Sequence, residues 1–337
     1  MSVVGFLRIF RAHSAPLTVL PVIIIPLMAG VKDVVHLLTL WVLTTIMHWM
    51  SFGHNSVLDW ERGWDRKDPY KKHFPLNTGE VDPVTASKVI NWGLSGIVAL
   101  LVVFMLVNAK RPELAVASFV IALQLGHAYD DGLDKITVWK WVPVFGYGYF
   151  TTLGFWFVYF DTLTDFGFWY TLSVGIIVEY QILYEGELKD FETEEANLFR
   201  VLGARVENGT LILTPPLVLL FLARAPLVFT VMLGLSSYCR WVGGISFTTY
   251  IMMIIYYCAF SLLVLYFLVQ LHLPRRRYDR NRELRNMATE EMVSYFLLFS
   301  FLFPKAPLAV PVLLLYSVGW LAFFNRVQWG TVVRPQV

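Results

Sequence analysis

The chain has 337 residues, of which 57% are hydrophobic and only 15% are charged. Soluble domains average about 45–50% apolar and about 25% charged residues, so this composition excludes an ordinary soluble protein. The formal net charge of +2 gives no sign of a nucleic-acid partner, and none is expected. The two cysteines, Cys239 and Cys258, provide neither a disulfide framework nor a metal-binding spacing.

The apolar residues are gathered into runs of about 20 residues, the length of helix that crosses a hydrocarbon layer of about 30 Å. The sequence therefore predicts an all-α polytopic membrane protein, a single domain over residues 1–337 with nine or ten transmembrane helices. The expected spans are Pro16–Val31, Val35–Phe52, Lys88–Val107, Leu114–His127, Val142–Phe160, Phe168–Tyr184, Leu211–Leu235, Ser246–Leu271 and a last stretch, Met292–Phe324. Because that stretch contains Pro304 and Pro307, it is either one broken span or a re-entrant or surface segment followed by one span.

Lysine and arginine are distributed unevenly between the loops. The loops after the second, fourth, sixth and eighth expected spans hold most of them, and the loops after odd-numbered spans hold few. Cytoplasmic loops of membrane proteins carry the excess of these residues. The N-terminus and the even-numbered loops, among them 53–87 and 185–210, are therefore expected on the cytoplasmic side of a cell membrane.

Two of these predicted cytoplasmic loops are rich in carboxylates. The first, residues 55–68, places Asn55 and Asp59 four residues apart. Residues with this spacing share one face of a helix. Asp65 and its neighbours extend the acidic cluster beyond the expected end of the helix.

The second acidic loop, residues 184–195, places Asp190 and Glu194 four residues apart. Like charges roughly 4 Å apart repel by about 4 kcal/mol at an effective dielectric of about 20. Mg²⁺ removes that cost, since it binds carboxylates together with substrate phosphates. Two facing clusters would hold two Mg²⁺ ions around one diphosphate and assist its departure from an allylic group. The alternative is that these charges only cap and solvate the span ends.

At these residues the sequence resembles the UbiA superfamily of intramembrane prenyltransferases. The first family motif is N-D-x-x-D-x-x-x-D; Asn55 and Asp59 match it, Ser56 replaces its first Asp, and Asp65 supplies its last. The spacing N-x-x-x-D-x-x-x-G-x-D is similar to the menaquinone branch of the family. The following segment, Lys72–Val81, resembles the family's basic tail.

The second family motif is Y-x-x-x-[KR]-D-x-x-x-D, and with one extra residue after the tyrosine it is similar to Tyr184, Lys189, Asp190 and Glu194. The segment 197–203 is similar to the T-L-x-V-x-L-G sequence of the family. Two weaker likenesses lie at Arg11–Thr18 and Tyr129–Gly146. The resemblance thus covers about residues 8–210, in the family's order.

The resemblance implies nine helices around a central cavity, two Mg²⁺ ions, a prenyl diphosphate donor and a lipophilic or aromatic acceptor in the membrane lipid. In this interpretation Asn55, Asp59 and Asp190 are catalytic. The expected metal ligands are Asn55, Asp59, Asp65, Asp190 and Glu194. The expected diphosphate-binding residues are Lys72, Lys135, Lys140, Lys189 and Tyr184. Arg11 and Ser14 are expected on the acceptor side.

The sequence also departs from the family pattern. Ser56 and Glu194 stand where the family has Asp, which alters the expected ligand set. Asp130, Asp131 and Asp134 are extra acids where the family shows proline and small residues. We interpret these three as a solvated helix end rather than as metal ligands.

The acceptor and the prenyl length remain open. A quinone precursor is one acceptor; a prenylglyceryl phosphate is another, and it would make the protein a prenyl ether-lipid synthase. A polytopic transporter is the alternative of another class, and it should place ionisable groups at mid-membrane, beside broken helices. The expected spans are nearly free of charge at their centres, where Glu179 is the best candidate.

Overall fold

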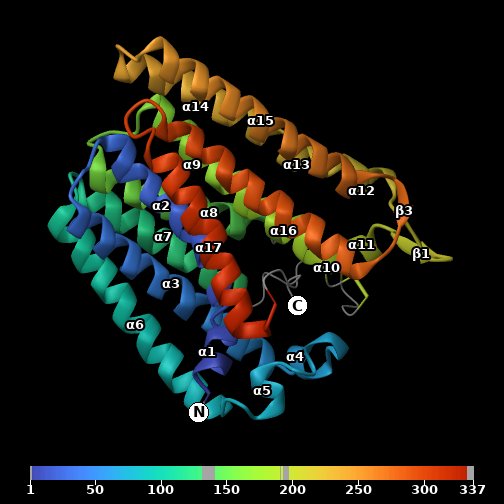
Figure 1. Cartoon of the computed structure of the whole chain (residues 1–337). Helices are drawn as coiled ribbons and strands as arrows, with labels where there is room; N and C mark the ends of the chain where they lie inside the picture. The colour runs from blue at the N-terminus through green and yellow to red at the C-terminus, as the bar shows by residue number, and fades with distance from the viewer. Residues whose placement is uncertain (1, 131–140, 190, 193–196, 332–337) are drawn as a thin grey trace. The chain divides into compact units, whose positions relative to one another are not determined.

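The computed structural model describes residues 2–130, 141–189, 191–192 and 197–331, and these residues are nearly all helical, as predicted (Figure 1). Seven of the described helical segments are long and apolar enough to cross a membrane, by length and composition. They are Ala12–Ala29, Val34–Glu61, Pro83–Asn108, Asp165–Lys189, Pro215–Val242, Phe247–His272 and Ala309–Trp329. The chain is therefore a multi-pass membrane protein.

Two further helices stand where spans were expected. α7 (Pro112–Asp130) and α8 (Trp141–Tyr159) have 19 residues each, but they are not among the seven. The sequence of α8 is rich in glycine, tyrosine and tryptophan, which contribute little to hydropathy. Nine spans therefore remain a prediction.

The described chain divides into two compact units. Unit 1 comprises residues 2–109 together with 311–331. Unit 2 comprises the described residues from 110 to 310. Each unit has its own helices and its own group of charged side chains.

Unit 1 contains α1 (Val3–Ile9), α2 (Ala15–Ala29), α3 (Val34–Glu61), α4 (Trp64–Lys67), α5 (Pro75–Thr78), α6 (Pro83–Asn108) and, from residue 311 on, α17 (Ala309–Trp329). α3 packs against both α2 and α6. The Trp41 indole on α3 donates to the Tyr316 hydroxyl at 2.7 Å, which joins α17 to α3. Asp33 and Asp82 cap α3 and α6. Hydrogen bonds from Thr85 hold the pKa of Asp82 below its usual value.

Unit 2 begins with three helices that pack in sequence: α7 on α8, and α8 on α9 (Asp165–Tyr180). α9 continues as a π-helical turn, η4 (Gln181–Gly186), and then as α10 (Glu187–Lys189). A separate short helix, α11 (Leu198–Val201), comes later in the chain. The next helix is broken into α12 (Pro215–Leu219), α13 (Phe221–Arg224) and α14 (Pro226–Val242), of which α14 packs on α9. α15 (Phe247–His272) packs on α16 (Arg280–Leu297), which ends in the 3₁₀ turn Leu298–Leu302.

A small antiparallel sheet corrects the expected start of the seventh span at Leu211. β1 (Arg205–Glu207) and β2 (Thr210–Ile212) form a hairpin, and β3 (Arg275–Arg277) pairs with β2. The turn residues Asn208 and Gly209 have φ of 50° and 71°, the positive values of a type I′ turn. The helix therefore begins only at Pro215, after the hairpin.

The last apolar stretch, expected over Met292–Phe324, is interrupted between Leu302 and Ala309. α16 begins at Arg280, before the apolar run, and α17 alone among these segments has the length and composition of a span. This arrangement corresponds to the expected alternative in which a separate segment precedes one span.

Candidate functional site

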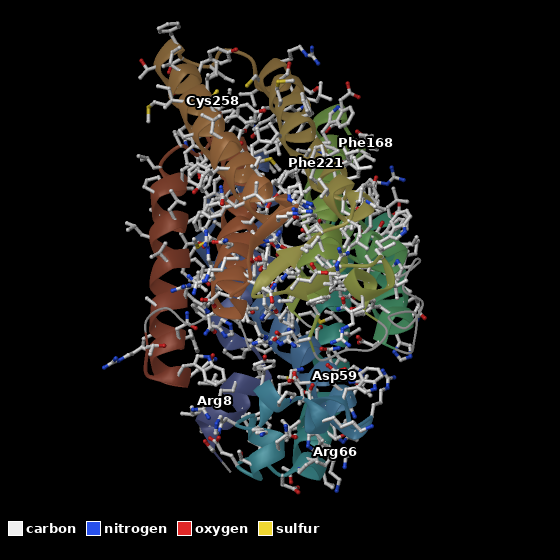
Figure 2. The ribbon with its side chains drawn as sticks, turned by 90° about the vertical axis from the view of Figure 1, so that its right-hand side faces the viewer. Arg8, Asp59, Arg66, Phe168, Phe221 and Cys258 are labelled. Atoms are coloured by element: carbon white, nitrogen blue, oxygen red, sulfur yellow. The ribbon has the colours of Figure 1, made fainter. Side chains whose placement is uncertain are left out.

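The first acidic segment lies at the end of α3 in unit 1. Asn55 and Asp59 are half-buried on the same face of this helix. α3 ends at Glu61, and Gly63, with φ of 81°, turns the chain into α4. Figure 2 shows Asp59 and Arg66 at the same end of unit 1 as Arg8. The turn thus brings the α4 side chains back beside the end of α3.

The loop after α3 is held together by Asp65, Lys71 and Asn77. Asp65 is only 3% exposed, and its carboxylate accepts a hydrogen bond from Lys71 Nζ at 2.5 Å. Asn77 Nδ2 donates to the backbone carbonyls of Asp65 (2.9 Å) and Lys71 (2.8 Å). Asp65, expected as a metal ligand, is thus neutralised by a lysine in this structure. Its role as a ligand remains a prediction.

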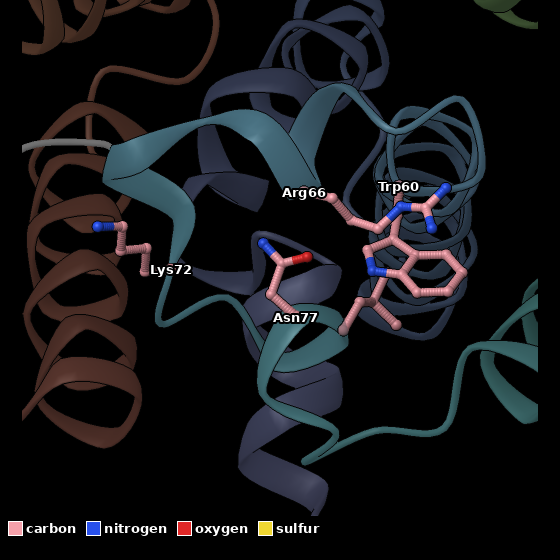
Figure 3. Close-up of a pocket in the computed structure, with 5 residues that line it drawn as sticks. Trp60, Arg66, Lys72 and Asn77 are labelled. Carbon is pink, nitrogen blue, oxygen red and sulfur yellow. The ribbon is translucent and has the colours of Figure 1, made fainter.

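A cavity of about 310 Å³ that is open to solvent lies against this loop (Figure 3). Its lining residues are Trp60, Arg66, Lys72, Leu76 and Asn77. The Arg66 guanidinium lies over the Trp60 ring, 4.8 Å from its centroid, which fixes the planar group at the edge of the cavity. Arg66 and Lys72 are both exposed, so their charges remain available to an anion.

Lys72 was expected to bind diphosphate, and it does line this cavity. Arg66, Trp60 and Asn77 were missed by the sequence interpretation. The signal was present in part, because Asn77 lies within the Lys72–Val81 segment that resembles the family's basic tail. The stacking of Arg66 on Trp60 depends on the α3–α4 turn, which no motif reports.

Arg11 and Ser14, expected on the acceptor side, lie together at the start of α2. Arg11 adopts a left-handed conformation with φ of 47°, and its carbonyl accepts a hydrogen bond from Ser14 Oγ at 2.9 Å. The His48 imidazole, 5% exposed, contacts Ser14 Oγ at 3.4 Å and Thr18 Oγ1 at 2.6 Å. His48 is thus a buried polar partner from α3 that the sequence did not indicate.

The second acidic segment lies in unit 2. Tyr184 is fully buried, and its hydroxyl donates to the Leu271 carbonyl at 2.7 Å. Lys189 ends α10 and is half-buried. The remaining site predictions of this part, namely Asp190, Glu194, Lys135 and Lys140, lie outside the described residues.

Three side chains that the sequence interpretation missed support the described part of this segment. The buried Asn197 donates to the Glu187 carbonyl at 2.7 Å, and the Glu187 carboxylate accepts a hydrogen bond from the Leu198 amide. Arg200 donates to the carbonyls of Phe191 (2.6 Å) and Glu192. The backbone at both edges of the segment is therefore fixed by side-chain hydrogen bonds.

The described residues do not contain a complete set of metal ligands. Among residues 2–130, 141–189, 191–192 and 197–331, no three His, Cys, Asp or Glu side chains are grouped so that they would hold a metal ion. Asn55 and Asp59 offer one amide and one carboxylate on a shared face. This donor set suits Mg²⁺, which is commonly held by one or two carboxylates while substrate phosphates supply further oxygen ligands.

Unit 2 also holds a buried ion pair that the sequence interpretation missed. Arg224, inside the expected span Leu211–Leu235, and Glu290 on α16 are both 0% exposed. The guanidinium binds the carboxylate in bidentate fashion, with Nε–Oε1 and Nη2–Oε2 distances of 2.8 Å. The expectation of spans nearly free of central charge is therefore wrong at Arg224, which lies beside the break before Pro226.

No protein-family model, curated protein or solved structure matches the chain. The function is therefore argued from the sequence motifs and from the site.

Proposed function

We propose that this chain is an integral membrane, Mg²⁺-dependent prenyltransferase. It moves a prenyl group from a polyprenyl diphosphate, such as geranylgeranyl diphosphate, to a lipophilic or aromatic acceptor and releases pyrophosphate. A quinone precursor and a prenylglyceryl phosphate both suit this reaction as acceptor. The sequence resemblance to the UbiA superfamily and the geometry at the end of α3 support the proposal.

The cavity beside the α3–α4 turn carries the proposal. Two exposed cations, Arg66 and Lys72, line this space of about 310 Å³ next to the helix end that bears Asn55 and Asp59. Oxygen donors and cations on neighbouring elements match the two needs of a Mg²⁺-bound diphosphate, metal ligation and charge neutralisation. An arginine fixed by stacking suits phosphate oxygens, because its planar guanidinium donates two parallel hydrogen bonds.

The chain's own residues would act on the leaving group. As the allylic C–O bond breaks, its electron pair leaves with the diphosphate, and negative charge grows on the phosphate oxygens. Arg66 and Lys72 would stabilise that charge, and Mg²⁺ held by Asn55 and Asp59 would supply further positive charge. The acceptor carbon or oxygen then forms the new bond to the prenyl carbon and releases its proton to water.

The deciding experiment is a product assay. Purified protein is incubated with geranylgeranyl diphosphate, Mg²⁺ and a panel of aromatic and prenylglyceryl acceptors, and pyrophosphate and product mass are measured. We expect pyrophosphate release that stops when Mg²⁺ is chelated, together with one prenylated acceptor. Protein that binds the donor equally well with and without chelator, and forms no product, would rule out the proposal.

The proposed site faces the cytoplasm. The Lys and Arg asymmetry supports a cytoplasmic N-terminus and cytoplasmic loops at 53–87 and 185–210 in the cell membrane. Single cysteines placed at Lys67 and Glu192, both exposed, are to be labelled from each side of the membrane. Labelling of either position from the outside only would contradict this topology.

A polytopic transporter is the second candidate, and the buried Arg224–Glu290 pair favours it. Intramembrane ionisable groups beside broken helices often line transport pathways, and Arg224 precedes such a break. Reconstituted vesicles that accumulate a solute, but release no pyrophosphate from a prenyl diphosphate, would select this function.

A further inference from the structure

The Arg224–Glu290 pair has a third ionisable neighbour. Glu185, in the π-helical turn η4, is 5% exposed, and its carboxyl lies next to that of Glu290. Within the described part of the chain, Glu185 Oε1 has no hydrogen-bond partner. The Tyr295 hydroxyl, on a side chain 1% exposed, likewise has no partner there and lies near Glu185 and Arg224.

The hydrogen-bond donors of Arg224 are used by Glu290 and by a backbone carbonyl. Besides the bidentate pair, Arg224 Nη1 donates to the Ile176 carbonyl at 3.2 Å. The Ser294 hydroxyl donates to Glu290 Oε1 at 2.9 Å. Glu290 thus accepts three hydrogen bonds. Its negative charge and the positive charge of Arg224 cancel, so nothing in this pair neutralises Glu185.

The surroundings of Glu185 bring more acidic than basic groups. The groups whose charges act on Glu185 or on its neighbours here are Tyr180, Tyr184, Arg224, Arg276, Glu283, Glu290, Glu291, Tyr295 and Tyr147. The cations among them are Arg224 and Arg276, and each already binds a carboxylate of its own, that of Glu290 and that of Glu283. A buried carboxylate without a cation is strongly unfavourable, so such a group takes a proton instead. A hydrogen bond between two carboxyl groups also requires a proton, because carboxylates only accept.

We propose that Glu185 and Glu290 form a proton-binding site inside unit 2, in which one exchangeable proton is held between the two carboxyl groups. With the proton bound, Arg224, Glu290 and Glu185 together are neutral. This inference holds whichever of the two candidate functions is correct.

The proton site lies in the same helical segment as the predicted diphosphate ligand Lys189. Glu185 lies in a π-helical turn. Such turns are rare in proteins, and those that occur are often found at functional sites. Glu185 precedes Lys189 by four residues of the same segment. Loss of the proton would leave a negative charge on η4 in the interior of unit 2, and the turn would then favour a conformation that exposes Glu185.

Unit 2 contains a matched control for this site. Like Glu185, Glu283 on α16 is buried, with 3% of its surface exposed. Both of its carboxylate oxygens accept hydrogen bonds from Arg276, at 2.9 Å (Nε) and 3.0 Å (Nη2). This pair has the same bidentate geometry, and Glu283 has no unpartnered carboxyl oxygen in the described structure. Glu283 thus has a cation of its own, whereas Glu185 and Glu290 share one cation and should hold a proton between them.

The test is infrared spectroscopy of the full chain in lipid at neutral pH. We expect a carbonyl stretch of a protonated carboxylic acid that moves on exchange into heavy water. The difference spectrum of wild type minus Glu185→Gln should contain this band, and that of wild type minus Glu283→Gln should not. Absence of the band from the Glu185→Gln difference spectrum would overturn the proposal. So would a band that Na⁺ or K⁺ abolishes, since a cation would then occupy the site.

A second measurement does not depend on spectral assignment. If the folded chain holds a proton that the unfolded chain releases, folding stability falls as the pH rises. Glu185→Gln mimics the protonated acid, so it should fold and should lose this part of the pH dependence, whereas Glu283→Gln should keep it. An identical pH dependence of the midpoint temperature of unfolding in wild type and Glu185→Gln would overturn the proposal.

Discussion

Unit 1 and unit 2 both contain groups of basic and acidic side chains, but those of unit 1 are mostly exposed to solvent and those in the interior of unit 2 are buried. At the end of α3, Arg66 and Lys72 are exposed beside a cavity, and only Asp65 is buried, with Lys71 as its partner. In the interior of unit 2, Arg224 and its partner Glu290 have no exposure to solvent. Exposed charged side chains can bind a ligand from solvent, whereas buried charged side chains have to be paired with one another.

This difference predicts which property each region controls. An ion pair between exposed side chains contributes about 0–1 kcal/mol, so surface charges are replaceable as far as folding is concerned. Removal of one partner from a buried pair costs about 3–5 kcal/mol, because the other charge stays buried without compensation. Variants in unit 1 should therefore change binding and turnover, and variants in the buried cluster should change stability.

The largest effect is expected for Glu290→Ala. The substitution removes both carboxylate oxygens that bind the buried Arg224 guanidinium, and Glu185 Oε1 makes no hydrogen bond that could replace them, so the free energy of unfolding should fall by about 3–5 kcal/mol. Glu113→Ala is the control, because Glu113 forms an exposed pair with Arg111 at 2.7 Å and its removal should change the free energy of unfolding far less. Reversible unfolding in mixed micelles measures both. Equal losses would show that burial does not set the value of the pair.

The second prediction concerns Asp59→Ala and rests on the proposed function. Loss of a metal ligand at the transition state should lower kcat by about 100-fold or more, with the free energy of unfolding nearly unchanged, because Asp59 is only half-buried. Asp161→Ala removes an exposed carboxylate far along the chain and should leave kcat unchanged. Steady-state pyrophosphate release measures both variants. An active Asp59→Ala protein would mean that the metal site lies elsewhere.

The third prediction concerns the cationic lining of the cavity. Arg66→Ala and Lys72→Ala should each raise KM for the prenyl diphosphate about tenfold, or about 1.4 kcal/mol, because each removes one charge that meets the phosphates. Lys67→Ala is the control, since Lys67 is exposed on α4 but does not line the cavity. Donor titration measures all three variants. A uniform effect would indicate a general electrostatic attraction rather than a site.

The positions of the helices were predictable because hydropathy averages over long runs. For the same reason a single charge such as Arg224 did not interrupt the expected span Leu211–Leu235. Its partner, Glu290, is 66 residues away, and only tertiary packing brings the two together. The start of the same span was wrong for another reason: the Asn208-Gly209 turn is a short-range hairpin signal that hydropathy does not register.

The candidate site was predictable in its residue types but only partly in its partners. Asn55 and Asp59 share a face of α3 as the spacing indicated. The Lys71 partner of Asp65 and the stack of Arg66 on Trp60 were not predictable, because both depend on how the chain turns after Glu61. The central question for the site is thus how that turn is made.

The smallest effect is expected for Gly63→Ala, which tests the turn itself. Gly63 has φ of 81°, a conformation that costs an L-residue about 1–2 kcal/mol, so the substitution should lower the free energy of unfolding by about 1 kcal/mol. A steric clash is not expected, since a Cβ at Gly63 would have Arg66 Nη2, at 3.5 Å, as its nearest contact.

Gly96→Ala is the control; Gly96 is exposed on α6 with open space around its Cβ position, and alanine should be neutral or stabilising there. Gly63→Asn should lose less than Gly63→Ala, because asparagine tolerates the left-handed region better. If all three variants unfold alike, the left-handed turn is not what holds the α3–α4 junction, and the position of Arg66 over Trp60 needs another cause.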